Sequence, residues 1–473
     1  MNVKSLVKNA AIAFLAQGIT LIISCITSLL VPKLLGVEEY GYWQLFVFYA
    51  GYVGFFHFGL NDGVYLLHGG ESRSQIDKRS INSQFCVGSI FQLILCVAII
   101  VAVVRADFGP QRGFILICAS YYMVAKNASA YLGYTFQAMN ETKLYSFSCI
   151  LERMVFLMPL VGLLLVGTQD FTGFVVAYCA SGTVQLLFCL WFARDFLMSG
   201  INSPKDSIEE SLGSVRVGIK LMFANIASQL ILGVARFVID AAWGIKTFGE
   251  LSLALSLVNF VLAFASQAAM VLFPALRQEN EENTGKFFCM AQNLMGLAFP
   301  AVYLFYFPGV WLLSMWLPQY ANSYIFFAYL LPVCVFDGKM NIACATCFKV
   351  TRQETLLLKI NVCTTCFSTL GAVLGGFAFN SIWVVIAAAV IAIIARSLIS
   401  EMILSGRLGV GRVPTITYGE LVVTLIFVVV ASVVVNYALA FVVYALIYGA
   451  YLALNRNSCK EVFGEMTRAL SHC

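Results

Sequence analysis

Long apolar stretches alternate with short polar segments along almost the whole chain of 473 residues. Most stretches hold about 20 residues, which as a helix rising about 1.5 Å per residue would cross about 30 Å of hydrocarbon. The pattern predicts an all-α polytopic membrane protein with about 14 transmembrane helices. The predicted spans are residues 10–31, 42–61, 83–104, 113–137, 146–166, 173–193, 218–240, 250–273, 287–308, 323–347, 355–378, 381–404, 418–435 and 437–455. The last two lie in one apolar stretch that is interrupted only around Asn436 and Tyr437, which leaves open whether they are two separate spans.

A short motif before the second span recurs 208 positions later, between the seventh and eighth spans. Each copy holds two glycines, one branched aliphatic residue and one aromatic residue at the same spacing: Gly36, Val37, Tyr40 and Gly41, and then Gly244, Ile245, Phe248 and Gly249. Such a repeat indicates two related halves that each begin with the same helical hairpin. Parallel repeats related about the membrane normal are one architecture of transporters, with the substrate site at the repeat interface.

The repeat divides the chain into four predicted parts. Residues 1–200 form an N-terminal lobe of six helices and residues 217–406 a C-terminal lobe of six helices, joined by a cytoplasmic linker at 201–216. Residues 407–473 hold two extra helices and a cytoplasmic tail. The linker lies within the longest polar segment, about 194–217, where Pro204 is followed by clustered charges.

The placement of basic residues predicts the orientation. If the N-terminus is cytoplasmic, the inside segments carry eighteen Lys and Arg residues, whereas the outside segments carry four, namely Lys33, Arg105, Arg112 and Lys246. This asymmetry follows the positive-inside rule and predicts that both termini are cytoplasmic.

Composition excludes a soluble protein. Hydrophobic residues make up 60% of the chain and charged residues only 11%, too few to cover the surface of a soluble domain of this size. Two Cys-x-x-Cys pairs, Cys344 with Cys347 and Cys363 with Cys366, have a spacing that fits a zinc ribbon. Both pairs lie in apolar helical runs without the polar turns of a zinc knuckle, so we expect no metal site.

The helix–turn–helix motifs resemble those of a known transporter superfamily. Two six-helix halves, each opening with an L-G-x-x-x-Y/F-G-like turn, and two extra C-terminal helices look like the multidrug/oligosaccharidyl-lipid/polysaccharide exporter superfamily. Within it, residues 35–41 (LGVEEYG) and 59–65 (GLNDGVY) are similar to the polysaccharide-biosynthesis flippases. The resemblance implies a V-shaped, two-lobed fold around a central cavity, working by alternating access.

The same resemblance implies the function, the partners and the location. Such flippases move undecaprenyl-pyrophosphate-linked oligosaccharide repeat units from the inner to the outer leaflet of the bacterial inner membrane, for O-antigen, capsule or exopolysaccharide synthesis. The implied partners are the lipid-linked oligosaccharide, membrane lipids, a polysaccharide polymerase and a chain-length regulator, with no nucleic acid. The chain is therefore not expected to be an enzyme or to need a cofactor, apart from a proton or sodium gradient.

Basic residues inside predicted spans are the candidate substrate contacts. Placing an ionisable group in a span costs about 2.5–3.5 kcal/mol of insertion free energy, so each such residue is expected to have a structural or functional role. Five cations fit this description and would attract a pyrophosphate, which Arg can bind through two oxygens. They are Arg236, Lys126, Arg153, Lys339 and Arg396. For each of them the alternative is an interhelical ion pair that only stabilises the fold.

Acidic residues inside spans are the candidates for ion coupling. These are Asp240, Asp337 and Glu152, and the sequence does not choose among them. Two other functions stay open. A cation-coupled multidrug exporter of the same superfamily typically has an acidic residue in its first helix, and residues 10–31 hold none. A membrane polysaccharide polymerase or ligase would need a large outside loop, which the predicted spans do not leave.

Overall fold

The computed structural model describes residues 23–24, 26–276, 281–411 and 414–460, and every regular element in those ranges is a helix. The chain divides into two compact units, Met1–Ile226 (unit 1) and Ala227–Cys473 (unit 2). The long α10 (Pro204–Leu276) continues from the first into the second. Each unit is therefore described by itself.

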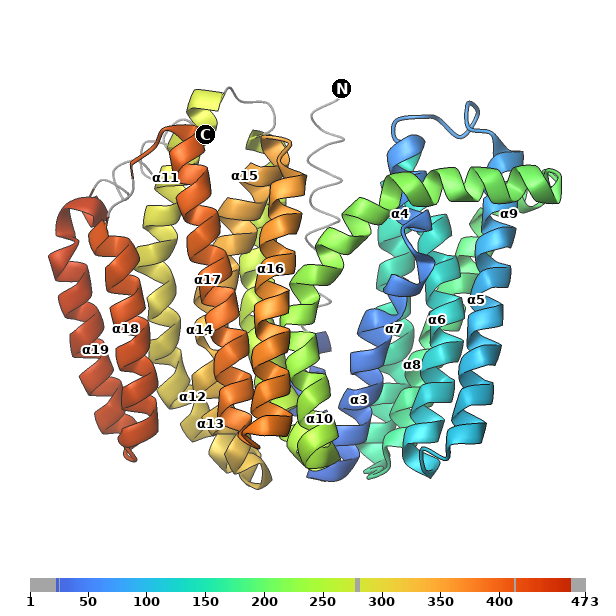
Figure 1. The fold of residues 1–473 in the computed structure, drawn as a ribbon. Helices are drawn as coiled ribbons and strands as arrows, with labels where there is room; N and C mark the ends of the chain where they lie inside the picture. The colour runs from blue at the N-terminus through green and yellow to red at the C-terminus, as the bar shows by residue number, and fades with distance from the viewer. Residues whose placement is uncertain (1–22, 25, 277–280, 412–413, 461–473) are drawn as a thin grey trace. The chain divides into compact units, whose positions relative to one another are not determined.

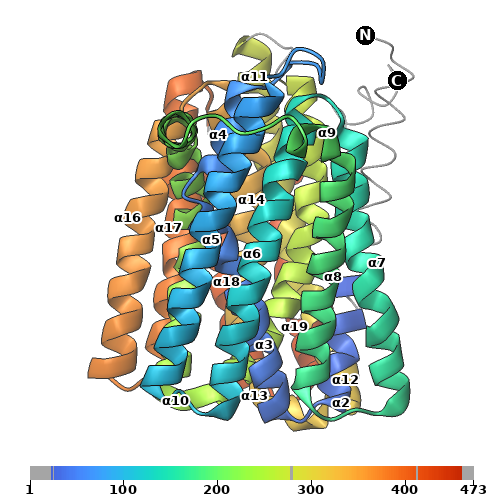
Figure 2. The same ribbon diagram turned by 90° about the vertical axis from the view of Figure 1, so that its right-hand side faces the viewer.

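Unit 1 is a bundle of helices that run beside one another (Figures 1 and 2). In chain order they are α2 (Val31–Leu34), α3 (Val37–Tyr52), η1 (Val53–His57), α4 (Leu60–Leu67), α5 (Lys78–Ala106), α6 (Pro110–Ala138), α7 (Thr142–Val166), α8 (Phe171–Phe192), α9 (Arg194–Leu197) and the first part of α10. The long helix α5 begins at a polar cap, where the Asp77 carboxylate accepts hydrogen bonds from the backbone N–H groups of Arg79 and Ser80.

The predicted second span is not one helix, which corrects the sequence prediction of an unbroken helix at 42–61. The chain follows α3, a 3₁₀ turn (η1) and α4, with left-handed backbone at Phe58 (φ 50°) and Gly59 (φ 88°) between them. A left-handed residue cannot continue an α-helix, and glycine adopts this conformation at little cost. The sequence predicts the length of this apolar segment correctly, but it does not predict the change of backbone conformation inside the segment.

The predicted linker is mostly helical. After Ser203, whose hydroxyl accepts a hydrogen bond from the Asp206 backbone N–H, α10 begins at Pro204, a residue favoured in the first turn of a helix. Its first part lies across the ends of the unit 1 helices (Figure 1). There Gly218 comes so close to Gly59 of α4 that a side chain at either position would collide with backbone. Small residues are what allow two helices to cross at this distance.

Unit 2 contains the rest of α10 and the remaining helices. They are α11 (Glu281–Ala298), η2 (Phe299–Ala301), α12 (Val302–Trp316), η3 (Pro318–Tyr320), α13 (Ala321–Leu330), α14 (Pro332–Lys339), a π-helical turn (Met340–Cys344), α15 (Ala345–Val350), α16 (Glu354–Val373), a second π-helical turn (Leu374–Ala378), α17 (Ile382–Leu408), α18 (Pro414–Val433) and α19 (Tyr437–Leu454). Inside α10, Gly244 (φ 79°) interrupts the helix, so the helical runs on either side of it correspond to the predicted seventh and eighth spans.

The last two predicted spans are two separate helices. Asn436 caps α19, its side chain accepting hydrogen bonds from the backbone N–H groups of Ala438 and Leu439. Aromatic rings join α18 and α19 to α12: Phe427 stacks on Tyr303 with ring centroids 4.3 Å apart and lies 5.6 Å from Tyr444. Both helices are therefore packed against the other helices of unit 2.

Ten helices in the described ranges are long and apolar enough to cross a membrane. Together with the all-helical architecture, this confirms a polytopic α-helical protein. The predicted first span, 10–31, lies largely outside the described residues, and so does the tail after residue 460.

Candidate functional site

Lys126 of α6 lies in a polar cluster inside unit 1. Its Nζ donates to Glu152 Oε2 on α7 at 2.7 Å and to Gln185 Oε1 on α8 at 3.1 Å. The Tyr122 hydroxyl donates to the other oxygen of Glu152 at 2.8 Å. The Lys126 side chain keeps 31% of its surface exposed, against 6% for Glu152. The lysine thus has a fixed partner, yet part of its side chain remains open to contact.

Arg153 follows Glu152 on α7 but lies against a different helix. Successive residues on a helix point about 100° apart, and Arg153 is half-buried beside Tyr178 of α8. The Tyr178 ring lies 5.2 Å from Tyr122 and 5.1 Å from Phe156, measured between ring centroids. Lys126, Glu152 and Arg153, which were predicted separately, therefore belong to one charged and aromatic cluster.

Arg236 is held by the second copy of the sequence repeat. Its guanidinium carbon lies 5.0 Å from the ring centroid of Phe248, and its Nη2 donates to Ser252 Oγ at 2.9 Å. The arginine is half-buried, whereas Asp240, one turn further along α10, is buried. The repeat motif and the arginine were both singled out in the sequence, and the structure shows that they are in contact.

Arg396 of α17 forms an ion pair with Asp337 of α14 and also donates to Ser228 Oγ at 2.5 Å. The arginine side chain is only 2% exposed and that of Asp337 is 19% exposed. Asn341 donates to the second carboxylate oxygen of Asp337 at 3.1 Å. The predicted cation at 396 and the predicted acid at 337 are thus partners of each other, which is the interhelical alternative considered for such residues.

Lys339 is buried between two carboxylates. Its Nζ donates to Glu420 Oε2 on α18 at 2.6 Å and lies 3.6 Å from Glu401 Oε2 on α17. Its side chain is 2% exposed. We did not single out Glu420 in the sequence, although it is the one acidic residue of the predicted span 418–435 and could have been found on that ground.

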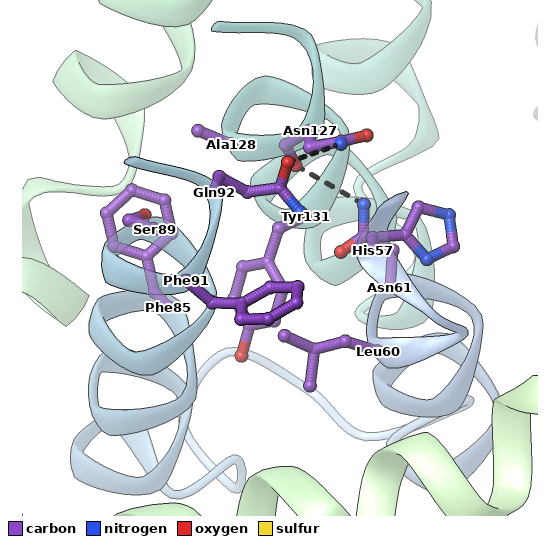
Figure 3. A pocket seen from close by; sticks show the side chains of 11 residues that line it. His57, Leu60, Asn61, Phe85, Ser89, Phe91, Gln92, Asn127, Ala128 and Tyr131 are labelled. Atoms are coloured by element: carbon purple, nitrogen blue, oxygen red, sulfur yellow. Dashed lines mark hydrogen bonds between the residues drawn. The ribbon is translucent and has the colours of Figure 1, made fainter. Parts of the chain in front are cut away.

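Polar side chains surround the break between α3 and α4 (Figure 3). Gln92 Nε2 donates to the backbone oxygen of Phe56 at 2.6 Å, and Asn127 Nδ2 donates to that of Val53 at 2.9 Å and to Gln92 Oε1 at 3.0 Å. Asn61 Nδ2 in turn donates to the Asn127 backbone oxygen at 3.3 Å. Broken helices are tolerated at membrane depth when side chains satisfy the freed backbone groups. A cavity of about 30 Å³ beside the break has room for about one water molecule.

Several basic loops of unit 1 meet at one end of its bundle. Arg73 forms ion pairs of 2.8 Å with both Glu141 and Asp195, and Lys78 pairs with Asp195 at 2.8 Å. Partial burial of Asp195 opposes its ionisation, but the hydrogen bond from Lys78 and the charges of Arg73 and Lys78 outweigh this effect and lower the pKa of Asp195. These loops were predicted to lie on one side of the membrane, and the contacts place them together.

Comparison with known proteins identifies the family. Residues 6–280 match the family described as "Polysaccharide biosynthesis protein". No curated protein matches the sequence. Within the described residues, no group of three or more His, Cys, Asp or Glu side chains could hold a metal ion.

Two solved structures show the fold. The lipid II flippase MurJ in an inward closed conformation has a TM-score of 0.65 and 10% identity, with 95% of this chain and 99% of that chain covered. An inward-facing multidrug resistance MATE family transporter of the MOP superfamily has a TM-score of 0.61 and 13% identity, with 85% and 98% covered. Identities this low establish the fold alone. The first is described as a flippase and the second as a transporter. The chain belongs to the polysaccharide biosynthesis protein family, and it is a multi-pass membrane protein with the fold of MOP superfamily transporters.

Proposed function

We propose that the protein transports undecaprenyl-pyrophosphate-linked oligosaccharide repeat units from the inner to the outer leaflet of the bacterial inner membrane. One observation carries this proposal: a chain that matches a polysaccharide biosynthesis family over residues 6–280 has the fold of MOP superfamily transporters. The relative described as a lipid II flippase supports a lipid-linked substrate. The polymer formed would be O-antigen, capsule or exopolysaccharide, and a polymerase and a chain-length regulator would act next.

The pyrophosphate is the chemically demanding part of this substrate, since its charge must pass through hydrocarbon. Lys126, Arg236 and Arg153 are the best placed of the five predicted cations to meet it, because all three side chains are only partly buried. Arg153, half-buried in the same cluster as Lys126, would add to the local positive charge. Charge-assisted hydrogen bonds to phosphate oxygens are among the strong contacts that these groups can make.

Lys339 and Arg396 fit the same role less well. Both side chains are 2% exposed and both are engaged by carboxylates of unit 2. Removing a buried cation from its carboxylate leaves an uncompensated charge, which costs several kcal/mol. We therefore propose that these two cations hold helices of unit 2 together, and that contact with the pyrophosphate falls to Lys126, Arg236 and Arg153.

Ion coupling would act on the carboxylates that compete for these cations. Glu152 holds the Lys126 ammonium at 2.7 Å, so a pyrophosphate that binds Lys126 must replace this partner or share it. A proton on Glu152 would weaken the pair and favour the substrate, and proton release would favour substrate departure. Asp240, one turn from Arg236, and Asp337, paired with Arg396, are the other candidates for a proton or sodium ion. In this cycle the substrate site would open alternately to the two sides of the membrane.

Deletion of the gene in its own host tests the proposal. We expect lipid-linked repeat units to accumulate in the inner leaflet and the surface polymer to disappear, with both defects repaired by the wild-type gene. Normal surface polymer in the deletion strain would contradict the proposal. Sensitivity to drugs with unchanged polymer would instead point to the multidrug exporter. Reporter fusions at Lys205 and Asn457 test the proposed cytoplasmic location of both sites.

A further inference from the structure

One buried cluster of unit 2 has more acidic than basic groups. Lys339 of α14 lies between Glu401 of α17 and Glu420 of α18, with side chains 2%, 5% and 0% exposed. Lys339 Nζ donates to Glu420 Oε2 at 2.6 Å, and Thr417 Oγ1 donates to Glu401 Oε1 at 3.0 Å. Two carboxylates and one ammonium, if all were ionised, would leave one negative charge inside the helix bundle.

Within the described part of unit 2, no neighbouring group supplies the missing positive charge. The pair formed by Arg396 and Asp337, on the same two helices α17 and α14, is neutral by itself. The other titratable side chains close to the cluster within the described part of unit 2 are uncharged at neutral pH: Cys344 after α14, Tyr303 of α12 and Tyr451 of α19. On α11 the position facing the cluster is Gly296. The described charges around the cluster therefore sum to minus one.

Two carboxylate oxygens of the cluster have no hydrogen-bond donor. Glu401 Oε2 and Glu420 Oε1 are both buried and accept no hydrogen bond within the described structure. A buried carboxylate normally has its oxygens satisfied, because an unmet charged acceptor is costly. One bound proton would give these oxygens a hydrogen-bond donor, and it would also remove the excess negative charge. A metal cation would be repelled by the Lys339 ammonium that already lies between the two acids.

We propose that this cluster binds one proton, shared by Glu401 and Glu420, while Lys339 neutralises the remaining negative charge. The proton allows three ionisable groups from α14, α17 and α18 to be buried at one point without net charge. The site does not depend on the identity of the transported lipid. Only a role for this proton in driving transport would rest on the function proposed above.

Thermal unfolding of the purified protein in detergent, followed as a function of pH, tests the site without any substrate. A native state that holds one proton more than the unfolded state becomes less stable as pH rises, by about tenfold in the folding equilibrium constant per pH unit. We expect the wild-type melting temperature to show this extra decrease as the pH rises from about 6 to about 9. Glutamine resembles a protonated glutamic acid, so Glu401→Gln and Glu420→Gln should each abolish it.

The matched control is Glu141→Gln, which changes a carboxylate of the other unit that is paired with Arg73. This variant should keep the wild-type pH dependence. Infrared spectra should show a protonated carboxylic acid band in the wild type that each cluster variant loses. The proposal is overturned if the wild type and Glu401→Gln share one pH dependence. It is also overturned if sodium chloride, compared with choline chloride, stabilises the wild type but not Glu420→Gln, because the site would then bind sodium. Neither result depends on the export assay, so failure of the site and failure of the proposed function can be told apart.

Discussion

Each unit contains a lysine from the middle of a predicted transmembrane span, and the two lysines have different surroundings. Lys126 in unit 1 has one carboxylate partner, Glu152, and a side chain that is 31% exposed. Lys339 in unit 2 has two carboxylates, Glu401 and Glu420, and a side chain that is 2% exposed. The sequence gives no sign of this difference, because both are single basic residues in apolar helices.

The difference indicates which lysine is available to a ligand. A pyrophosphate approaching Lys126 meets part of an open side chain, and the ammonium can exchange one anionic partner for another. A pyrophosphate approaching Lys339 would have to enter a filled interior and add charge to a cluster that already has an excess of acid. On this ground we propose that Lys126 meets the substrate and that Lys339 stabilises unit 2.

Lys339→Met should have the largest effect on stability. It leaves two buried carboxylates without their cation, and breaking a buried pair in this way costs about 3–5 kcal/mol. We expect little folded protein in the membrane, measured by the yield and melting temperature of the purified variant. Combining it with Glu420→Gln removes one of the two carboxyl groups that Lys339 leaves behind and should restore part of the yield. An unchanged melting temperature for Lys339→Met would mean that the cluster does not stabilise unit 2.

Lys126→Met should have an intermediate effect on stability. It removes a charged hydrogen bond to Glu152, a loss of about 1.5–3 kcal/mol before the exposed part of the side chain is considered. Solvent contact lets Glu152 recover some hydration, so the measured loss should lie below that of Lys339→Met. Chemical denaturation of both variants in the same detergent measures the difference. Equal losses of stability in the two variants would contradict the proposed difference between the two lysines.

Asp195→Asn, at the charged end of unit 1, should have the smallest effect. Exposed ion pairs contribute about 0–1 kcal/mol. Because the pKa of Asp195 is lowered in the folded state, its contribution is present above the ordinary carboxyl pKa of about 3.9 and is lost as pH falls through the lowered value. The wild type should therefore exceed the variant in stability at neutral pH, and the two should converge in acid. Unfolding curves at neutral and at acid pH test this prediction. A stability difference between wild type and variant that grows in acid would contradict the predicted direction of the pH dependence.

The all-helical, multi-pass architecture could be predicted from the sequence because hydrophobic length is a local property. The partners of the charged residues could not, since Lys126 and Glu152 are 26 positions apart and Lys339 and Glu420 are 81 apart. Which acid meets which base depends on how the helices pack. The break at Phe58 and Gly59 was missed for the same reason. It is accompanied by hydrogen bonds from Gln92 and Asn127 on two other helices.

Our central claim is that the protein moves a lipid-linked oligosaccharide with the help of the partly exposed cation Lys126. Purified protein in liposomes containing a fluorescent undecaprenyl-pyrophosphate-linked oligosaccharide tests this directly, with transfer between leaflets as the readout. We expect Lys126→Arg to retain transfer, because a guanidinium also binds phosphate, and Lys126→Met to be about tenfold to a hundredfold slower than wild type. Both rates are compared at equal amounts of folded protein. Transfer by Lys126→Met at the wild-type rate, or no transfer above empty liposomes for the wild type, would contradict the claim.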